Sequence, residues 1–272
     1  MHRLSRLAPD TARLPFATLA GLAGLGAGLS LSALCFGAGA AFLIGFSKTG
    51  IPGAGMPAIT LMAEAFRDNT KLSVGAMVPL LILGDIFGVI FFRRHANWQR
   101  LLEVLPYIVI GMIPGYLVLQ WMPSESLRSL IGILILVLLT VHVGCQRLGW
   151  QAVLERKWFA GMMGLLAGFG TVAGNAAGPA MSIYLLNKKV DKHEFVGTSA
   201  WLFFLVNSSK VPFQAWMGVI TWQTVRLDLC VLPMLMGGVL LGVFVHKRIP
   251  QRAFDSLVLI LSALAALQMV CF

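Results

Sequence analysis

Charged side chains are scarce in this sequence: they make up only 12% of its 272 residues, whereas hydrophobic residues make up 58%. Soluble globular domains usually carry about 25% charged residues. A chain with so few charges cannot cover a core of that size in water, so lipid must solvate much of its surface. The composition therefore excludes an ordinary soluble domain and indicates an integral membrane protein.

Cysteine is scarce as well, with four residues in the whole chain. The four lie far apart in apolar segments, and no Cys-X-X-Cys or Cys/His spacing occurs. This pattern supports neither a disulfide framework nor a metal site. We expect neither a metal nor a cofactor.

Nothing in the chain resembles a polar linker, so one compact bundle is expected. The net charge of +10 comes from Lys and Arg scattered over short loops between apolar runs. Such loops are typical of the cytoplasmic side of membrane proteins, and we expect no nucleic-acid partner. The apolar run at 14–46 is far longer than the roughly 7–15 apolar residues of a signal peptide. Residues 14–34 are therefore predicted to form a first membrane helix.

The sequence carries an internal repeat with a nearly constant spacing. Single dipeptide matches arise by chance, but several matches in the same order predict a duplication. The matches are Pro57-Ala58 with Pro179-Ala180, Gly75 with Gly197, Asp85 with Asn207, Trp98-Gln99 with Trp222-Gln223, and Pro123 followed by Ser129-Leu130 with Pro250 followed by Ser256-Leu257.

Each half repeats one order of segments: a short apolar piece, a Gly-rich break, a second short piece and three long apolar segments. The long segments are close to the ~20 residues that span a bilayer, whereas the short pieces resemble half-helices or a re-entrant hairpin. The predicted breaks are 47–57 and 170–179, the short pieces are 35–46, 58–66, 157–169 and 180–186, and the long segments are 72–92, 101–121, 128–145, 195–217, 227–245 and 253–271.

Loop charges predict the orientation. With the N-terminus in the cytoplasm, the richly basic loops all fall inside. Each half then crosses the membrane an odd number of times, so the halves are inverted, whether or not the hairpins themselves cross fully. We predict an all-α polytopic membrane helical bundle of two inverted repeats, each with a broken or re-entrant Gly-Pro hairpin and three long transmembrane helices, plus one extra N-terminal helix. The predicted boundaries are 1–34 for the N-terminal cytoplasmic segment and first helix, 35–145 for the first repeat, 146–157 for a cytoplasmic connecting loop and 158–272 for the second repeat.

The two breaks are candidate anion sites, because a half-helix N-terminus offers free N–H donors and a partial positive charge. Lys48 lies in the first break, and a lysine at membrane depth is a functional candidate by default. Two alternatives stay open: the glycines allow close helix packing, and Lys48 extends to the membrane surface. The candidate substrate-binding residues are Lys48, Thr49, Gly50, Gly53, Gly55, Thr171, Asn175, Gly178, Asn207, Ser208, Lys210 and Gln214.

Asp85 interrupts a long apolar segment, and its repeat counterpart is Asn207. Inverted repeats would bring these two residues close to the pseudo-twofold axis. Asp85 is a candidate for proton coupling. The alternative is a structural ion pair with Lys210, since buried charge pairs need no transport role.

Three stretches of the chain, 45–63 (GFSKTGIPGAGMPAITLMA), 78–119 and 194–214 (EFVGTSAWLFFLVNSSKVPFQ), resemble the sulfite exporter TauE/SafE family. The resemblance runs from about residue 35 to the end. It implies a multi-pass transporter in a bacterial inner membrane, with the lipid bilayer and a small anion as partners: sulfite, a sulfonate or a related organic anion. Many members have a glycine-richer G-X-G-G-G loop where this chain has Lys48-Thr49-Gly50-Ile51-Pro52, so sulfite itself is not assumed.

The expected function is export of a small sulfur-containing anion by alternating access, with proton coupling through Asp85 as a second hypothesis. A passive anion channel is the first alternative. An intramembrane hydrolase using Ser199, in a loose G-X-S-X pattern, is the second; His142 and His246 show no convincing partner pattern for it. We expect a transporter and no enzyme, and make no prediction of oligomeric state.

Overall fold

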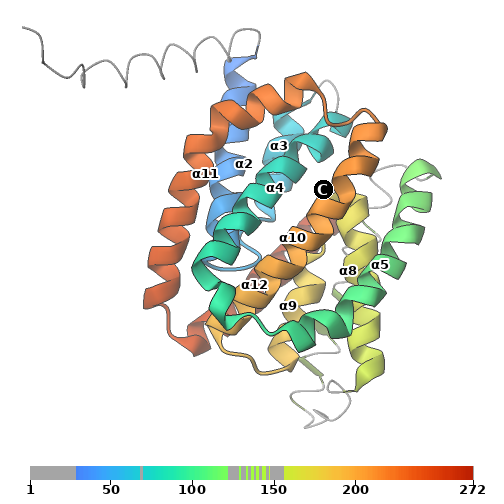
Figure 1. The fold of residues 1–272 in the computed structure, drawn as a ribbon, viewed down its shortest axis with the longest axis vertical. Helices are drawn as coiled ribbons and strands as arrows, with labels where there is room; N and C mark the ends of the chain where they lie inside the picture. Colours follow the sequence, from blue (N-terminus) through green and yellow to red (C-terminus); the bar gives the residue numbers. More distant parts are fainter. Residues whose placement is uncertain are drawn as a thin grey trace, which may run out of the picture.

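The structure is a computed structural model, and it describes residues 29–67, 70–121, isolated positions between 129 and 147, and 156–271. All regular structure within these residues is helical (Figure 1). Most of the predicted helix at 14–34 and of the predicted segment at 128–145 lies outside the described residues. The elements are α2 (Leu31–Thr49), α3 (Pro57–Ala65), α4 (Thr70–Phe92), the short 3-10 helix η1 (Arg93–His95), α5 (Trp98–Trp121), α8 (Lys157–Gly174), α9 (Gly178–Asn187), α10 (Lys192–Trp216), α11 (Trp222–Arg248) and α12 (Gln251–Cys271).

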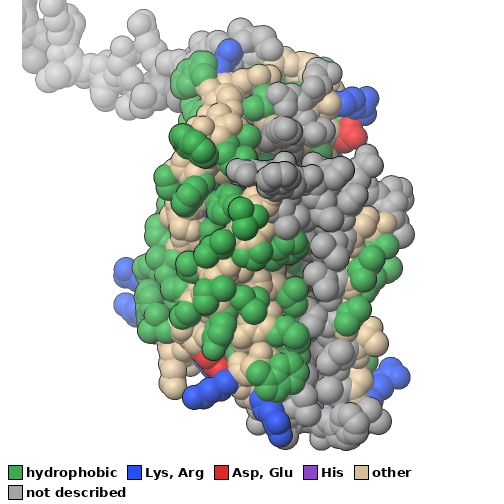
Figure 2. All heavy atoms as spheres, turned by 90° about the vertical axis from the view of Figure 1, so that its right-hand side faces the viewer, with side chains coloured by type: hydrophobic (Ala, Val, Ile, Leu, Met, Phe, Trp, Pro, Cys, Tyr) green, Lys and Arg blue, Asp and Glu red, His purple; other side chains and the backbone are tan. Residues whose placement is uncertain are grey.

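Four of these helical segments are long and apolar enough to cross a membrane: Leu31–Thr49, Leu72–His95, Trp98–Leu117 and Trp222–Arg248. On the described part of the face in Figure 2, hydrophobic side chains are the commonest kind, and Lys and Arg lie mainly near the margins. The prediction of an all-α polytopic membrane bundle is confirmed.

The elements of the second half follow the order of those in the first. Figure 1 shows the α2–α3 hairpin entering from the upper end and the α8–α9 hairpin from the lower end. The packing is reciprocal: α2 lies along α11, whereas α8 lies along α5, the counterpart of α11 in the first half. α4 and α10 pack against each other at the seam. The repeat boundaries themselves stay a prediction.

Two bundles follow from these contacts. The first contains α2, α3, α4 and α11. The second contains α5, α8, α9 and α12, with α10 at the seam. The turns between α4 and α5, between α9 and α10 and between α11 and α12 meet at one end, where Arg100 bonds the Lys188 carbonyl and Lys192 bonds Gln251. We call this the basic end.

Glycines allow close contact within each bundle. A Cβ at Gly45 or Gly238 would collide with backbone of the facing helix in the α2–α11 pair, and a Cβ at Gly111 or Gly168 would do so in the α5–α8 pair. Small residues at such positions let membrane helices approach closely. These four positions lie outside the predicted breaks, so they do not decide whether the glycines of the breaks serve packing or binding.

The breaks are shorter than the sequence predicted. α2 continues through Thr49, so Lys48 and Thr49 are helical and the break covers 50–56. α8 continues through Gly174, so the break there is 175–177. A membrane helix tolerates glycine, so it can continue into a Gly-rich stretch. A prediction from glycine content alone therefore began each break several residues too early in the chain. The predicted boundary at residue 34 also lies inside α2.

Asn175 ends α8 in a left-handed conformation with φ 57°. The Ala176 amide then donates to the Gly170 carbonyl at 2.9 Å, and this hydrogen bond closes the end of the helix. In most helices that end this way, the left-handed position is a glycine, whereas here it is Asn175. Asparagine tolerates this conformation better than most residues.

Candidate functional site

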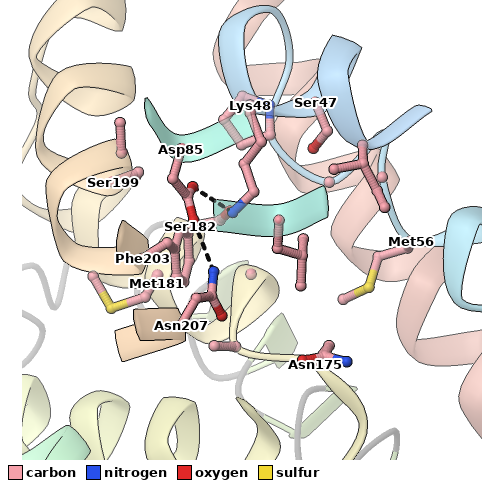
Figure 3. Close-up of a pocket in the computed structure, with 18 of the residues that line it drawn as sticks. Ser47, Lys48, Met56, Asp85, Asn175, Met181, Ser182, Ser199, Phe203 and Asn207 are labelled. Carbon is pink, nitrogen blue, oxygen red and sulfur yellow. Dashed lines mark hydrogen bonds and ion pairs between the residues drawn. The ribbon is translucent and has the colours of Figure 1, made fainter. Parts of the chain in front are cut away.

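A cavity of about 90 Å³ lies between the two bundles, beside both breaks. A water molecule needs about 10–15 Å³ of such space, so the cavity has room for a small ion or several waters. α2, α3 and α4 line one side, and α8, α9 and α10 line the other (Figure 3). Its polar lining residues are Ser47, Lys48, Asp85, Thr171, Asn175, Ser182, Ser199 and Asn207.

Asp85 lies at the centre of the site and is fully buried. The Lys48 ammonium lies 2.6 Å from one carboxylate oxygen, and the Asn207 amide donates to the other at 2.7 Å (Figure 3). Asp85 and Asn207 thus meet at the seam between α4 and α10, as expected for repeat counterparts near a pseudo-twofold axis. The ion pair of Asp85 is with Lys48 and not with Lys210, which corrects the alternative drawn from the sequence; α2 brings Lys48 to α4.

Lys48 reaches Asp85 through space left by glycine. A Cβ at Gly84 would lie 2.9 Å from Cγ of Lys48, and a Cβ at Gly88 would lie 3.1 Å from its carbonyl oxygen. The ammonium also lies 4.5 Å from the centroid of the Phe203 ring. A cation over an aromatic face gains electrostatic stabilisation.

Lys210 is a second buried cation, and its side chain is inaccessible to solvent. Its ammonium donates to Asn175 Oδ1 at 2.7 Å, to Thr171 Oγ1 at 3.1 Å and to the Thr171 carbonyl at 3.3 Å. All three acceptors are neutral, and within the described part of the chain Lys210 has no carboxylate within ion-pair distance. Two lysines thus lie close to a single carboxylate, that of Asp85.

The N-termini of α3 and α9 also face this space. Gly53 and Gly55 line the cavity in front of α3, and Ala177 and Gly178 do so at α9. Neither helix has a side-chain cap at its N-terminus. Both begin with proline at the first or second position, which suits a helix start.

Eight of the residues singled out from the sequence line the cavity, and five do not. Thr49 instead bonds the Val239 and Gly45 carbonyls, and Gly50 packs against Gly242. Lys210 reaches the site only through Thr171 and Asn175. Ser208 and Gln214 lie on α10, as Lys210 does, but they are not among the residues that line the cavity. The eight lining residues are Lys48, Gly53, Gly55, Asp85, Thr171, Asn175, Gly178 and Asn207.

Sequence reasoning missed Gly84, Gly88 and Phe203. Gly84 precedes Asp85 directly, and a small residue beside a buried acid is a usable signal. Phe203 carries no such signal, because one more phenylalanine in an apolar segment is indistinguishable from core. Ser199, the residue of the hydrolase alternative, lines the cavity, but no histidine is among the lining residues that the structure describes.

A polytopic helical bundle that encloses a cavity with polar side chains between broken helices has the architecture of a membrane transporter. The family model "Sulfite exporter TauE/SafE" matches residues 16–269, and the chain belongs to this family. It is a family of membrane transporters, so the chain is a multi-pass membrane protein with a small anion and lipid as its partners. No curated protein and no solved structure matches the chain.

Proposed function

We propose that this protein is a secondary transporter that exports a small sulfur-containing anion, sulfite or a C2 sulfonate, by alternating access across a bacterial inner membrane. The N-terminus and the basic end face the cytoplasm in this proposal. The anion binds in the cavity between the two bundles and contacts Lys48 and the N-termini of α3 and α9.

The excess positive charge of the site carries the proposal. Lys48 belongs to α2 of the first bundle and Lys210 to α10 at the seam, and Asp85 is the single carboxylate that lines the cavity in the described structure. A buried charge without a partner is costly. An anion in the cavity would compensate the second lysine, so the site favours an anion over a cation or a neutral solute.

Asp85 gives the site a means of proton coupling. When Asp85 is ionised, it competes with an anion for the Lys48 ammonium, 2.6 Å away. When Asp85 takes up a proton, Lys48 is released to the anion and the site carries two uncompensated positive charges. Anion and proton therefore bind together and move in the same direction, so an outward anion gradient drives export of both, and loss of the proton expels the anion.

Purified protein should be screened for a thermal shift with sulfite, sulfate, thiosulfate, sulfoacetate, isethionate and taurine. A ligand at about 100 times its Kd stabilises the folded state by about 2.7 kcal/mol, so a selective shift names the anion class. Lys210→Met should abolish most of the shift, because it removes the uncompensated charge. Lys247→Met is the matched control, since this lysine is exposed at the basic end. An equal shift in both variants, or no shift with any anion, contradicts the proposal.

Proteoliposomes separate a coupled transporter from a passive channel. An imposed pH difference should drive accumulation of the anion that gave the thermal shift, against its own gradient. A channel would only dissipate that gradient. Accumulation that stops at equal concentrations on both sides would leave the channel as the better explanation.

A further inference from the structure

Three histidines meet at the basic end, away from the cavity. His246, in the last turn of α11, is fully buried, and its Nε2 lies 3.2 Å from Nδ1 of His193 at the start of α10. His95 of η1 lies against His193, with ring centroids 5.2 Å apart. Phe92 meets the His246 ring edge to face at 4.8 Å. The cavity and its chemistry use none of these histidines.

The bonding of His246 determines where its proton lies. Its other ring nitrogen, Nδ1, is 3.2 Å from the Gly50 carbonyl oxygen. A carbonyl only accepts, so Nδ1 must carry the hydrogen. In a neutral imidazole Nε2 is then an acceptor, and Nδ1 of His193 must donate to it. The pair tolerates one extra proton, on His193, but not two.

A second proton would place two N–H groups and two positive charges face to face across 3.2 Å. Donor groups cannot bond each other, and like charges at this distance repel. The contact between the two histidines is therefore stable only while His246 keeps its free lone pair.

The pair joins the first bundle to α10, the helix at the seam between the two bundles. His246 and its partner Gly50 belong to the bundle of α2 and α11, whereas His193 begins α10. Within the described residues α10 and α11 do not pack along their lengths, so the histidine contact lies where only their ends meet. Beside it, the Lys192 ammonium donates to the carbonyls of His246 and Ile249, at 2.7 Å each.

The surroundings are mostly positive. Around the pair, α10 contributes Lys192, Asp191 and Glu194; Asp191 caps its own helix, and Glu194 pairs with Arg100 of α5. Asp255 of α12 accepts from Gln251. No carboxylate in the described structure pairs with either histidine. The charged and titratable groups at this end are Arg93, Arg94 and His95 before α5, Arg100 and Glu103 on α5, Arg156 and Lys157 at the start of α8, Lys188 and Lys189 after α9, Asp191, Lys192 and Glu194 at the start of α10, Lys247 and Arg248 on α11, and Arg252 and Asp255 on α12.

We propose that His193 and His246 form a proton-operated gate between the two bundles at the basic end. The gate is closed while the pair holds at most one extra proton, and uptake of the second proton separates the bundles there. This is a proton-binding site distinct from Asp85, on a different pair of helices. It acts whichever anion is carried, and its opening needs no substrate.

The gate is tested by a distance measurement between bundles without any anion. Spin labels on Lys157→Cys of α8 and Lys247→Cys of α11, both exposed near the basic end, report the separation in full-length protein whose native cysteines are replaced by serine. We expect a longer-distance population to grow as the pH is lowered stepwise from about 8 to the acid limit at which the protein stays folded, because the second proton must enter a pair that already carries one. If one proton is taken up per opening, the ratio of the longer-distance to the shorter-distance population rises by up to about tenfold for each unit by which the pH falls.

His193→Asn is the decisive variant. The Asn amide occupies the place of Nδ1 and can turn to donate to His246 or to accept from it, so the contact survives protonation and the distance distribution becomes independent of pH. His95→Asn is the matched control and keeps the wild-type slope, because His95 stacks on the pair without bridging the bundles. A flat wild-type profile, or an unchanged slope in His193→Asn, overturns the gate. Either result leaves the anion screen and the proposed transport function untouched.

Discussion

At the scale of single residues, Asp85 is the group on which the proposed coupling depends. It is fully buried, and both carboxylate oxygens are engaged, one by a charged partner and one by a neutral partner. Removing one member of a buried ion pair usually costs about 3–5 kcal/mol, because the other charge stays behind. Lys48 borders the cavity, so here an anion can take over the role of the missing carboxylate.

Asp85→Asn should therefore separate binding from coupling. The amide keeps the shape of the side chain and leaves Lys48 free for the anion, so we expect anion affinity at neutral pH to rise by roughly tenfold, equivalent to about 1.4 kcal/mol. Accumulation driven by a pH difference should be lost, while exchange of anion across the membrane persists. Calorimetry measures the affinity, and transport into proteoliposomes measures the coupling. Retained pH-driven accumulation would remove Asp85 from the coupling role.

At the scale of elements, the sequence predicted most of the long helices to within a few residues. α5, predicted at 101–121, is Trp98–Trp121, and α11, predicted at 227–245, is Trp222–Arg248. Hydrophobic length determines these helices, so composition reveals them. The breaks were placed less well, because glycine marks both a helix end and a close helix contact, and a single sequence does not distinguish the two.

The same ambiguity limited the predicted site. Lys48 and Asp85 were found because a charge in an apolar segment is conspicuous, and the repeat added Asn207. Which lysine pairs with Asp85 depends on helix packing, which no local pattern encodes. The partner of His246 was missed for the same reason: His193 is 53 residues away along the chain and belongs to another helix.

Helix contact through glycine leads to a prediction for the α2–α11 pair. Gly45→Val should destabilise the protein or prevent its insertion, because a Cβ at Gly45 collides with the Leu235 backbone, which cannot move aside as a side chain can. Overpacking of this kind costs about 1–3 kcal/mol or more. Gly237→Val is the matched control, since among the described residues a Cβ at Gly237 would lie near only Phe42, at 4.0 Å. The melting temperatures of the detergent-solubilised variants give the comparison, and equal values would show that this contact is not tight.

At the scale of the whole molecule, the inverted arrangement gives the two ends different chemistry. The turns at one end are rich in Lys and Arg. The loops that the sequence predicts to lie outside hold only four basic residues, Arg67, Lys71, Arg128 and Arg226. Basic loops remain in the cytoplasm during insertion. The histidine gate at the basic end would then respond to cytoplasmic pH, and Asp85 would bind its proton at the seam between the bundles.

The orientation can be tested on one helix, because α11 runs from one end of the molecule to the other (Figure 1). Gln223 and Lys247 are both exposed and lie near its two ends. In a background without native cysteines, Gln223→Cys should react with a membrane-impermeant maleimide added to intact cells, and Lys247→Cys should react only after the membrane is permeabilised. Both positions lie on the same helix, so differences in expression or folding between elements do not affect the comparison. The reverse pattern would place the basic end outside the cell, and the histidine gate would then respond to external pH.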